Sequence, residues 1–396
     1  MLSQRELFFS HLAQTSFEPL ALEIVEASGV YLKDKNGKTY IDLISGISVS
    51  NIGHRHSKVV EAIRLQTDKY LHLMVYGEYI QSPQVLLASK IASLLPETLS
   101  NVFFVNSGSE ANEGALKLAR KFTGRSEIIS CVNAYHGSTL GALSAIGCAD
   151  YKKWFAPLVP GFSNIRFGNM EDISLITDKT AAVLIEPVQG EAGVRTASKE
   201  YWTALQEQCK ATGTLIIADE VQTGFGRTGK MFGFEFAGFT PDIITLAKGM
   251  GGGMPIGAFV ASKEMMNCLA NNPILSHITT FGGHPVSAAA ALACINVITE
   301  EHLTDDISRK SEIIVSFLKD IKGVKEIRAA GFLIAIEFES FEINKKIIDA
   351  AITNGVIGDW FLFCDNSLRI APPLNITDEE LLIALDLIKK SIQSIL

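Results

Sequence analysis

Two opposite charges follow apolar runs of the sequence that have the composition of buried strands. Asp219 ends the run TLIIAD (214–219), and Lys248 directly follows IITLA (243–247). Taken singly, a carboxylate after a strand is usually a helix cap and a lysine there usually lies on the surface. In an open α/β sheet, however, the carboxyl ends of the strands face one crevice. A charge placed there persists only if it is paired or used chemically.

Two further segments follow apolar runs and could complete a site with this pair. Residues 106–112 (NSGSEAN) open a helix, where free N–H groups and the helix dipole can hold a phosphate, although a simple serine cap is the alternative. Tyr135 lies in the segment after 127–132 and offers an aromatic face. Pyridoxal phosphate (PLP) chemistry needs this combination, because a lysine forms the Schiff base and an acid keeps the pyridine nitrogen protonated.

Two other motifs suggest different chemistry. Residues 224–230 (GFGRTGK) fit the glycine–lysine spacing of a nucleotide-binding loop, but Met231 stands where a magnesium-binding hydroxyl is needed and no strand precedes the loop. His54 and His56 could be metal ligands, but no second cluster completes such a site, so structural or channel-lining histidines are favoured and no metal is expected.

The elements that must position these residues alternate between strands and helices. Helical patterns at 110–122 and 200–213 lie between apolar runs, which predicts an α/β fold with a mostly parallel sheet flanked by helices. The apolar runs are 102–105, 127–132, 181–186, 214–219, 243–247 and 256–260. Both chain ends carry short strands beside helices and predict a smaller α+β domain. We therefore expect residues 1–55 and 311–396 to form the small domain and 56–310 the large one.

Composition narrows the function classes. The 396 residues carry a formal charge of −8 with scattered lysines and arginines, which favours neither nucleic acid nor an anionic membrane as a partner. The most apolar helical stretch, 286–298, is too short to span a bilayer, which takes about 20 residues. The start of the chain lacks a signal-peptide pattern, and six scattered cysteines indicate reduced thiols. These features predict a cytoplasmic enzyme with no membrane partner.

The sequence strongly resembles the class III (ω-amino) aminotransferases of PLP fold type I over nearly its whole length. The matching segments are NIGHRHSKVVEAI, NSGSEANEGALKLAR, AYHGST, EPVQGEAG, IADEVQTGFGRTG, PDIITLAKGMGGGMPIGA, TTFGGHPVSAAAA and LRIAPPLNIT. The most similar subgroup is the acetylornithine and ornithine aminotransferases. The resemblance implies a homodimer with shared active sites.

The resemblance also assigns cofactor roles to individual residues. Lys248 would carry PLP as a Schiff base and move a proton once substrate displaces it, while Asp219 would pair with the ring nitrogen. Tyr135 would stack on the ring and Gln222 would contact its hydroxyl. The remaining cofactor contacts implied are Ser107, Gly108, Ser109, Glu186 and, from the partner subunit, Thr280.

For the substrates, the resemblance implies an exchangeable ion pair. Arg369 would clamp the α-carboxylate of glutamate or 2-oxoglutarate, and Glu191 would mask that arginine while an ω-amine is bound. The expected reaction moves an amino group from an acetylornithine-like ω-amino compound to 2-oxoglutarate by a ping-pong mechanism. The alternatives are an ornithine or 4-aminobutyrate aminotransferase, or a PLP mutase, racemase or lyase on the same scaffold; a regulatory protein that kept the fold is a third class.

Three positions depart from what the resemblance implies: Ile47 from the ornithine enzymes, Ser138 from both the ornithine and the acetylornithine enzymes, and His284 from the family. Ile47, a substrate-binding position, replaces a tyrosine that holds the free α-amino group of ornithine. Ser138 replaces an arginine that grips the substrate carboxylate, which leaves Arg55 as a substitute or a donor without a carboxylate there. His284 replaces an asparagine, with no consequence that the sequence alone explains.

Overall fold

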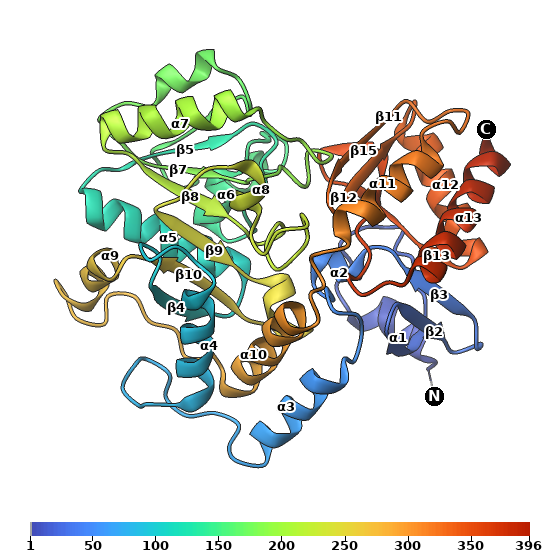
Figure 1. Ribbon diagram of the computed structural model, residues 1–396, viewed down its shortest axis with the longest axis horizontal. Helices are drawn as coiled ribbons and strands as arrows, with labels where there is room; N and C mark the ends of the chain where they lie inside the picture. The colour runs from blue at the N-terminus through green and yellow to red at the C-terminus, as the bar shows by residue number, and fades with distance from the viewer. Residues whose placement is uncertain (1) are drawn as a thin grey trace.

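The computed structural model describes residues 2–396 and shows two lobes (Figure 1). The larger lobe is built on a seven-stranded sheet of order β4-β10-β9-β8-β7-β5-β6. All its pairings are parallel except those of β10, which runs antiparallel to β4 and β9, so the prediction of a mostly parallel sheet is confirmed. The strands are β4 (Asn101–Val105), β5 (Glu127–Cys131), β6 (Phe162–Ile165), β7 (Thr180–Ile185), β8 (Leu215–Asp219), β9 (Ile243–Leu246) and β10 (Gly257–Ala261).

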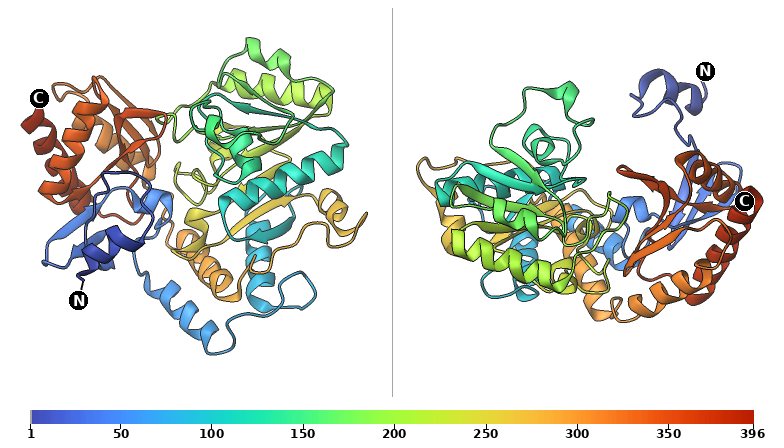
Figure 2. Two further views of the ribbon diagram at one scale, coloured as in Figure 1. Left: turned by 180° about the vertical axis from the view of Figure 1, so that it is seen from behind. Right: turned by 90° about the horizontal axis from the view of Figure 1, so that it is seen from above.

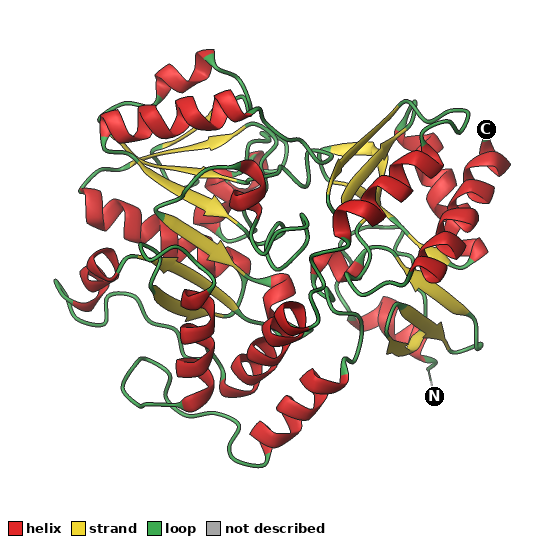
Figure 3. Cartoon of the chain, viewed as in Figure 1, coloured by secondary structure: helices red, strands yellow, loops and turns green. Residues whose placement is uncertain are grey.

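Helices cover both faces of this sheet, as Figure 3 shows. Alternate residues of one strand enter different cores: Ile217 packs in the core that includes α5 (Gly108–Thr123), and Ile216 packs in the core that includes α7 (Lys199–Thr212). Burial on both faces explains why the strands are continuous apolar runs instead of alternating patterns. The two helices predicted from periodicity are therefore confirmed. The remaining helices of this lobe are α3 (Ser57–Thr67), α4 (Ser82–Ser93), α6 (Leu140–Ala145), α8 (Gly233–Ala237), α9 (Lys263–Asn267) and α10 (Pro285–Glu300).

The smaller lobe combines both ends of the chain. Strand β13 (Val356–Ile357) pairs in parallel with β3 (Thr39–Asp42), so N- and C-terminal segments share one sheet of order β1-β2-β3-β13. A second sheet has the order β11-β12-β15-β14. The hydrophobic core of the small lobe also includes Ile307 and Ile314 of α11. The domain boundary expected at residue 310 therefore falls inside this helix. The elements are α2 (Ser45–Ser48), β1 (Ile24–Ser28), β2 (Tyr31–Asp34), α11 (Ile307–Leu318), β11 (Glu326–Ala330), β12 (Leu333–Glu337), α12 (Phe341–Asn354), β14 (Asp359–Phe361), β15 (Cys364–Ile370) and α13 (Asp378–Ile395).

One helix stands apart from the two lobes. Helix α1 (Gln4–His11) buries none of its residues and projects from the rest of the chain in the right-hand view of Figure 2. No helix of residues 2–396 is long and apolar enough to cross a membrane. The six cysteines are unpaired throughout the part of the chain that the structure describes.

The glycine-rich segment 224–230 joins the two lobes and does not form a phosphate loop. Arg227 is fully buried, and its guanidinium donates to Pro372 O and Asn51 Oδ1, each at 2.5 Å. Its carbonyl accepts from Phe332 N at 2.8 Å. Burial lowers the pKa of Arg227 to about 9. Lys230, the lysine that a nucleotide site would use, is exposed. Arg227 therefore ties the N- and C-terminal parts of the small lobe to the large one.

Replacement of Arg227 by methionine is expected to lower the free energy of unfolding by about 2 kcal/mol, because two buried acceptors lose their donor. Urea titration of the cofactor-loaded protein measures the change. Lys230→Met, three residues away on the surface, is the control and should shift it by less than about 0.5 kcal/mol. Equal stabilities for Arg227→Met and Lys230→Met would contradict this role for the segment.

Candidate active site

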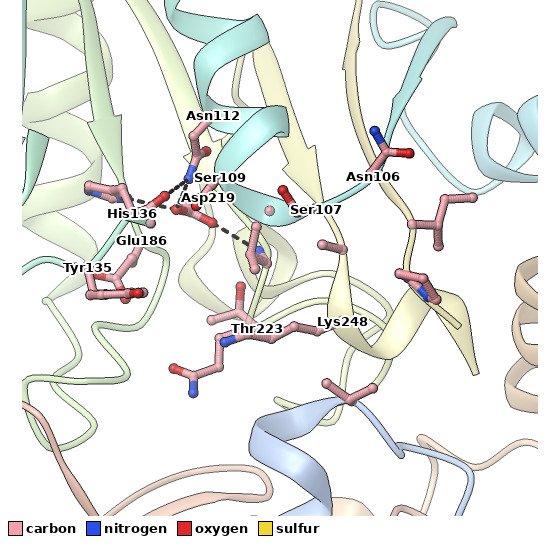
Figure 4. A pocket seen from close by; sticks show the side chains of 18 of the residues that line it. Asn106, Ser107, Ser109, Asn112, Tyr135, His136, Glu186, Asp219, Thr223 and Lys248 are labelled. Atoms are coloured by element: carbon pink, nitrogen blue, oxygen red, sulfur yellow. Dashed lines mark hydrogen bonds and ion pairs between the residues drawn. The ribbon is translucent and has the colours of Figure 1, made fainter. Parts of the chain in front are cut away.

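A cavity of about 460 Å³ opens at the carboxyl ends of the parallel strands, where the sequence predicted a site. Figure 4 shows side chains from several strand ends arranged around it. The predicted residues that line it are Ser107, Gly108, Ser109, Tyr135, Glu186, Glu191, Asp219, Gln222 and Lys248. The structure therefore brings nine of the expected site residues together.

Asp219 is held as a buried hydrogen-bond acceptor at the end of β8. Its Oδ2 accepts from His136 Nδ1 at 2.7 Å and from Asn112 Nδ2 at 2.8 Å, and its Oδ1 accepts from Val221 N at 3.0 Å (Figure 4). Hydrogen bonds of this kind stabilise the ionised form of a buried carboxyl group. Asn112 and His136 were not predicted as site residues, although both lie in segments quoted from the sequence. The position of Asn112 on the first turns of α5 and the imidazole next to Tyr135 were the available signals.

Lys248 lies directly after β9 in a left-handed backbone conformation, with φ of 45°. This region is uncommon for residues other than glycine and is strained, so the surrounding structure must hold it there. Burial lowers the pKa of the Lys248 ammonium group. The described residues give its amine no hydrogen-bonded or ion-paired partner, and the charges of Glu191, Arg369 and Asp219 act on it only at longer range. Lys248 is thus an amine with a lowered proton affinity that faces an open cavity.

The first turn of α5 offers free backbone donors to the same cavity. Ser107 caps the helix by accepting from Glu110 N at 3.2 Å. Within residues 2–396 the amides of Gly108 and Ser109 have no acceptor. A side chain at position 108 would place its Cβ 2.7 Å from Val221 Cγ1, so only glycine fits between the helix and the loop after β8. The turn can therefore hold an anion, as helix N-termini do.

Tyr135, Glu186 and Gln222 also line the cavity. The hydroxyl of Tyr135 lies 3.1 Å from Ser138 Oγ, and its backbone amide donates to Glu186 Oε2 at 3.3 Å. Burial, reinforced by the nearby Asp219 carboxylate, raises the pKa of Glu186 well above its ordinary value. Gln222 Nε2 donates to Glu191 Oε1 at 3.4 Å. Ser138 is exposed and brings no positive charge to this region.

Arg369 and Glu191 form a buried ion pair at the contact between the lobes. Arg369 Nη2 lies 2.6 Å from Glu191 Oε2, and both side chains are almost fully buried. Burial alone would raise the pKa of Glu191, but the charge of Arg369 outweighs it and the pKa lies below its usual value. The Nε and Nη1 atoms of Arg369 have no acceptor among the described residues. Two donors of a buried guanidinium are thus left available for another anion.

Three predicted residues do not line this cavity: Arg369, which lies behind Glu191 as its ion-pair partner, Thr280 and Ile47. Thr280 is exposed on the surface of the chain, away from the cavity lining. Ile47 is also absent from the lining, whereas Val49 takes part in it. The reason lies in the backbone, because residues 45–48 are four consecutive left-handed residues that turn the segment sharply. Spacing in the sequence cannot show which side chain such a turn directs at the cavity.

The two histidines weighed as metal ligands contact acids one at a time. His54 Nε2 lies 2.8 Å from the buried Asp42, and His56 Nε2 lies 3.9 Å from Glu301. No group of three or more metal-binding side chains gathers anywhere within residues 2–396. Arg55, considered as a substitute for the missing arginine at position 138, is exposed and does not line the cavity.

The donors and acceptors of the cavity fit PLP. A free lysine amine, a buried carboxylate that accepts three hydrogen bonds, an aromatic side chain and a helix N-terminus correspond to its aldehyde, ring nitrogen, ring face and phosphate. These are the features that its chemistry requires, and each comes from a different strand end.

Comparisons of the whole chain with known proteins identify its family. The family model "Aminotransferase class-III" matches residues 12–392. The acetylornithine aminotransferase of Methanocaldococcus jannaschii is 41% identical over 91% of this chain and 91% of its own length. A transaminase from the marine bacterium Virgibacillus has a TM-score of 0.92 at 32% identity, covering 99% of this chain and 98% of its own. The ornithine aminotransferase of Toxoplasma gondii, crystallised with partial PLP occupancy, has a TM-score of 0.88 at 29% identity, with coverage of 98% and 93%. The chain belongs to the class III aminotransferases, and it is a PLP-dependent transaminase.

Proposed function

We propose that this transaminase moves an amino group from an acetylornithine-like ω-amino compound to 2-oxoglutarate by a ping-pong mechanism. The observation that carries the proposal is the buried Arg369, which pairs with Glu191 and keeps two N–H donors free. The donor assignment is supported by the 41% identity to an acetylornithine aminotransferase.

The residues around the cavity suggest how the cofactor is held. When bound, PLP supplies an aldehyde that can carry an amino group and a ring that withdraws electrons. Lys248 Nζ would hold it and transfer protons, since a lowered pKa leaves more of the amine neutral. Asp219 would keep the ring nitrogen protonated. The amides of Gly108 and Ser109 at the start of α5 would bind the phosphate, with Ser107 as the cap of that turn. Tyr135 would cover the ring, and Gln222 and Glu186 would contact its polar edge.

The Arg369–Glu191 pair would let one pocket accept two unlike substrates. A 2-oxo dicarboxylate brings a carboxylate that can replace Glu191 as the bidentate partner of the guanidinium. With an ω-amine donor no carboxylate reaches Arg369, and Glu191 then neutralises the buried cation. Without Glu191 an unpaired buried charge would oppose donor binding, because unpaired charges are costly in the interior.

The residues near Tyr135 bear on the identity of the donor. Ser138 makes a hydrogen bond with the Tyr135 hydroxyl and supplies no cation for a distal carboxylate. Ile47 does not line the cavity, so it does not decide between donors. The 41% identity to an acetylornithine aminotransferase ranks acetylornithine first, with 4-aminobutyrate and ornithine as the alternative donors.

We also propose that the working form is a homodimer in which Thr280 reaches the cofactor site of the other subunit. A second cavity of about 730 Å³ is lined by residues of the 75–88, 101–104 and 266–282 segments, and several exposed apolar side chains lie in or next to the first and last of these segments. Surfaces of this kind mark protein interfaces. Exposed apolar residues of segments 71–88 and 266–282 include Leu71, Leu73, Met74, Tyr79, Ile80, Val85, Leu86, Ile274, Leu275, Ile278 and Phe281. Thr280 lies within this surface.

A donor screen tests the proposed reaction. We expect acetylornithine to convert the cofactor-loaded enzyme in single-turnover absorbance measurements, and 2-oxoglutarate to reverse the change with formation of glutamate. Ornithine and 4-aminobutyrate should react at least about tenfold less efficiently, a difference of one or two lost contacts. Glutamate alone should release 2-oxoglutarate, which a mutase would not do. A preference for 4-aminobutyrate or ornithine would overturn the donor assignment, and no release from glutamate would overturn the transfer reaction.

Subunit complementation tests the role of Thr280. Lys248→Ala and Thr280→Ala homodimers should both be defective at low cofactor concentration. Their co-expression gives heterodimers with one intact site each, so activity should recover to about a quarter of the parent value if chains pair at random. If Thr280 served the site of its own chain, no mixed dimer would contain an intact site and activity would not recover. Sedimentation of the parent protein as a monomer would also contradict the proposal.

A further inference from the structure

Glu191 lies on a short hairpin that projects from the large lobe. Gln189 and Arg195 exchange two backbone hydrogen bonds of 3.0 Å, and Gly193 N donates to Gly190 O at 3.0 Å. Glu191 therefore occupies the tip of hairpin 189–195. Its position depends on how this hairpin is held.

The hairpin is docked on the second sheet of the small lobe. Val188 and Val194 pack in a separate apolar cluster with Leu333 of β12 and Phe361 of β14. Val194 is in the left-handed region, with φ of 59°, which is unfavourable for a β-branched residue and must be stabilised by its surroundings. The contacts to the small lobe thus hold the hairpin in a conformation that its own sequence disfavours.

Arg328 of β11 makes the polar contact that fixes the tip of the hairpin. Its Nε donates to Gly193 O at 2.6 Å, while Nη1 pairs with Glu337 at 2.6 Å and with Glu326. The arginine side chain is only 9% exposed. Gly193 has φ of 84°, and a Cβ there would lie 2.6 Å from Cys364 Sγ. Glycine therefore allows the carbonyl to approach the guanidinium, whose orientation the two glutamates maintain.

The hydrogen bond from Arg328 to Gly193 lies two residues from Glu191, on the same hairpin. Glu191 Oε2 is 2.6 Å from Arg369 Nη2 and 3.1 Å from Leu362 N, so its carboxylate needs a defined position to satisfy both donors. Its carbonyl accepts from Phe363 N at 3.0 Å. Arg328 is thus one of a few tethers between the small lobe and the hairpin. Arg195 of the hairpin adds longer ion pairs to the same two acids, at 3.8 Å from Glu326 and 4.0 Å from Glu337, but it does not contact the tip.

We infer that Arg328 is a positioning residue that sets how readily Arg369 exchanges Glu191 for a substrate carboxylate. The inference rests on the exchange described under the proposed function. With Arg328 in place, the hairpin presents Glu191 to Arg369 and the closed ion pair is favoured. Without it, Glu191 competes less well, Arg369 is more often free, and dicarboxylates bind more tightly at the expense of the ω-amine donor.

Glutarate is the probe for this inference, because it carries two carboxylates and no reactive carbonyl. Isothermal titration of the cofactor-loaded enzyme should give a Kd for glutarate that is about fivefold lower in Arg328→Met than in the parent, the effect of losing one charge-assisted hydrogen bond. Glu191→Gln should lower the Kd at least as much. Arg309→Met removes another arginine that pairs with two acids, Asp306 and Asp378, on the surface of the small lobe. This matched control should leave the Kd within about twofold of the parent value.

A second readout separates positioning from general loss of structure. In Arg328→Met the kcat/KM of the amine-donor half-reaction should fall while that of glutamate does not, whereas a damaged fold would lower both. Arg328→Lys retains a charge near Glu337 without the planar fork, and its Kd should lie between those of the parent and Arg328→Met. If Arg328→Met fails to fold, Arg328→Lys alone tests the inference. Suppose that folded Arg328 variants bind glutarate with the parent Kd while Glu191→Gln still shifts it. This result would overturn the role of Arg328 and leave the proposed exchange intact. No shift in Glu191→Gln would overturn the exchange itself.

Discussion

The active site depends on keeping opposite charges at the buried edge of a parallel sheet. Asp219 remains an acceptor there because His136 donates to it from the segment after β5, Asn112 from α5 and Val221 N from the loop after β8. Lys248 has no such partner among residues 2–396, and burial lowers the pKa of its amine. The protein thus stabilises one charge and leaves the other group available, which is the asymmetry a PLP lysine needs. After Lys248 the chain turns back into the antiparallel strand β10, and the loop between Lys248 and β10 closes one side of the cavity.

The second constraint is the contact between the lobes. Arg227 joins the glycine-rich loop of the large lobe to Asn51 and Pro372 of the small one, and Arg328 joins the small lobe to hairpin 189–195. Arg369 and Glu191 meet at this contact, one from each lobe. Arginine suits all three positions, because a planar guanidinium can satisfy several buried acceptors at once. The substrate end of the cavity is therefore fixed by the packing of the lobes as much as by any single element.

Much of the sheet could be predicted from the sequence, because strands covered on both faces are continuous apolar runs that stand out from their surroundings. The residues after these runs, from Ser107 to Lys248, followed from the rule that strand ends meet at one edge. Strand β6 was missed because its four residues (FSNI) are short, partly polar and at the edge of the sheet. The reversed direction of β10 has no local signal. His136 and Asn112 were missed because their importance depends on reaching Asp219, 83 and 107 residues away in the chain. The sequence placed Ile47 at the substrate, whereas the structure has Val49 in the cavity lining. The four consecutive left-handed residues that cause this difference cannot be predicted from SGIS.

The central claim is that Lys248 is the residue that holds the cofactor. Borohydride reduction converts a lysine–carbonyl linkage into a stable amine, so peptide mass spectrometry of the reduced, digested enzyme can locate it. We expect the peptide that contains Lys248 to carry the mass of reduced PLP and no other lysine peptide to carry it. The same mass on a different lysine, with the Lys248 peptide unmodified, would contradict it.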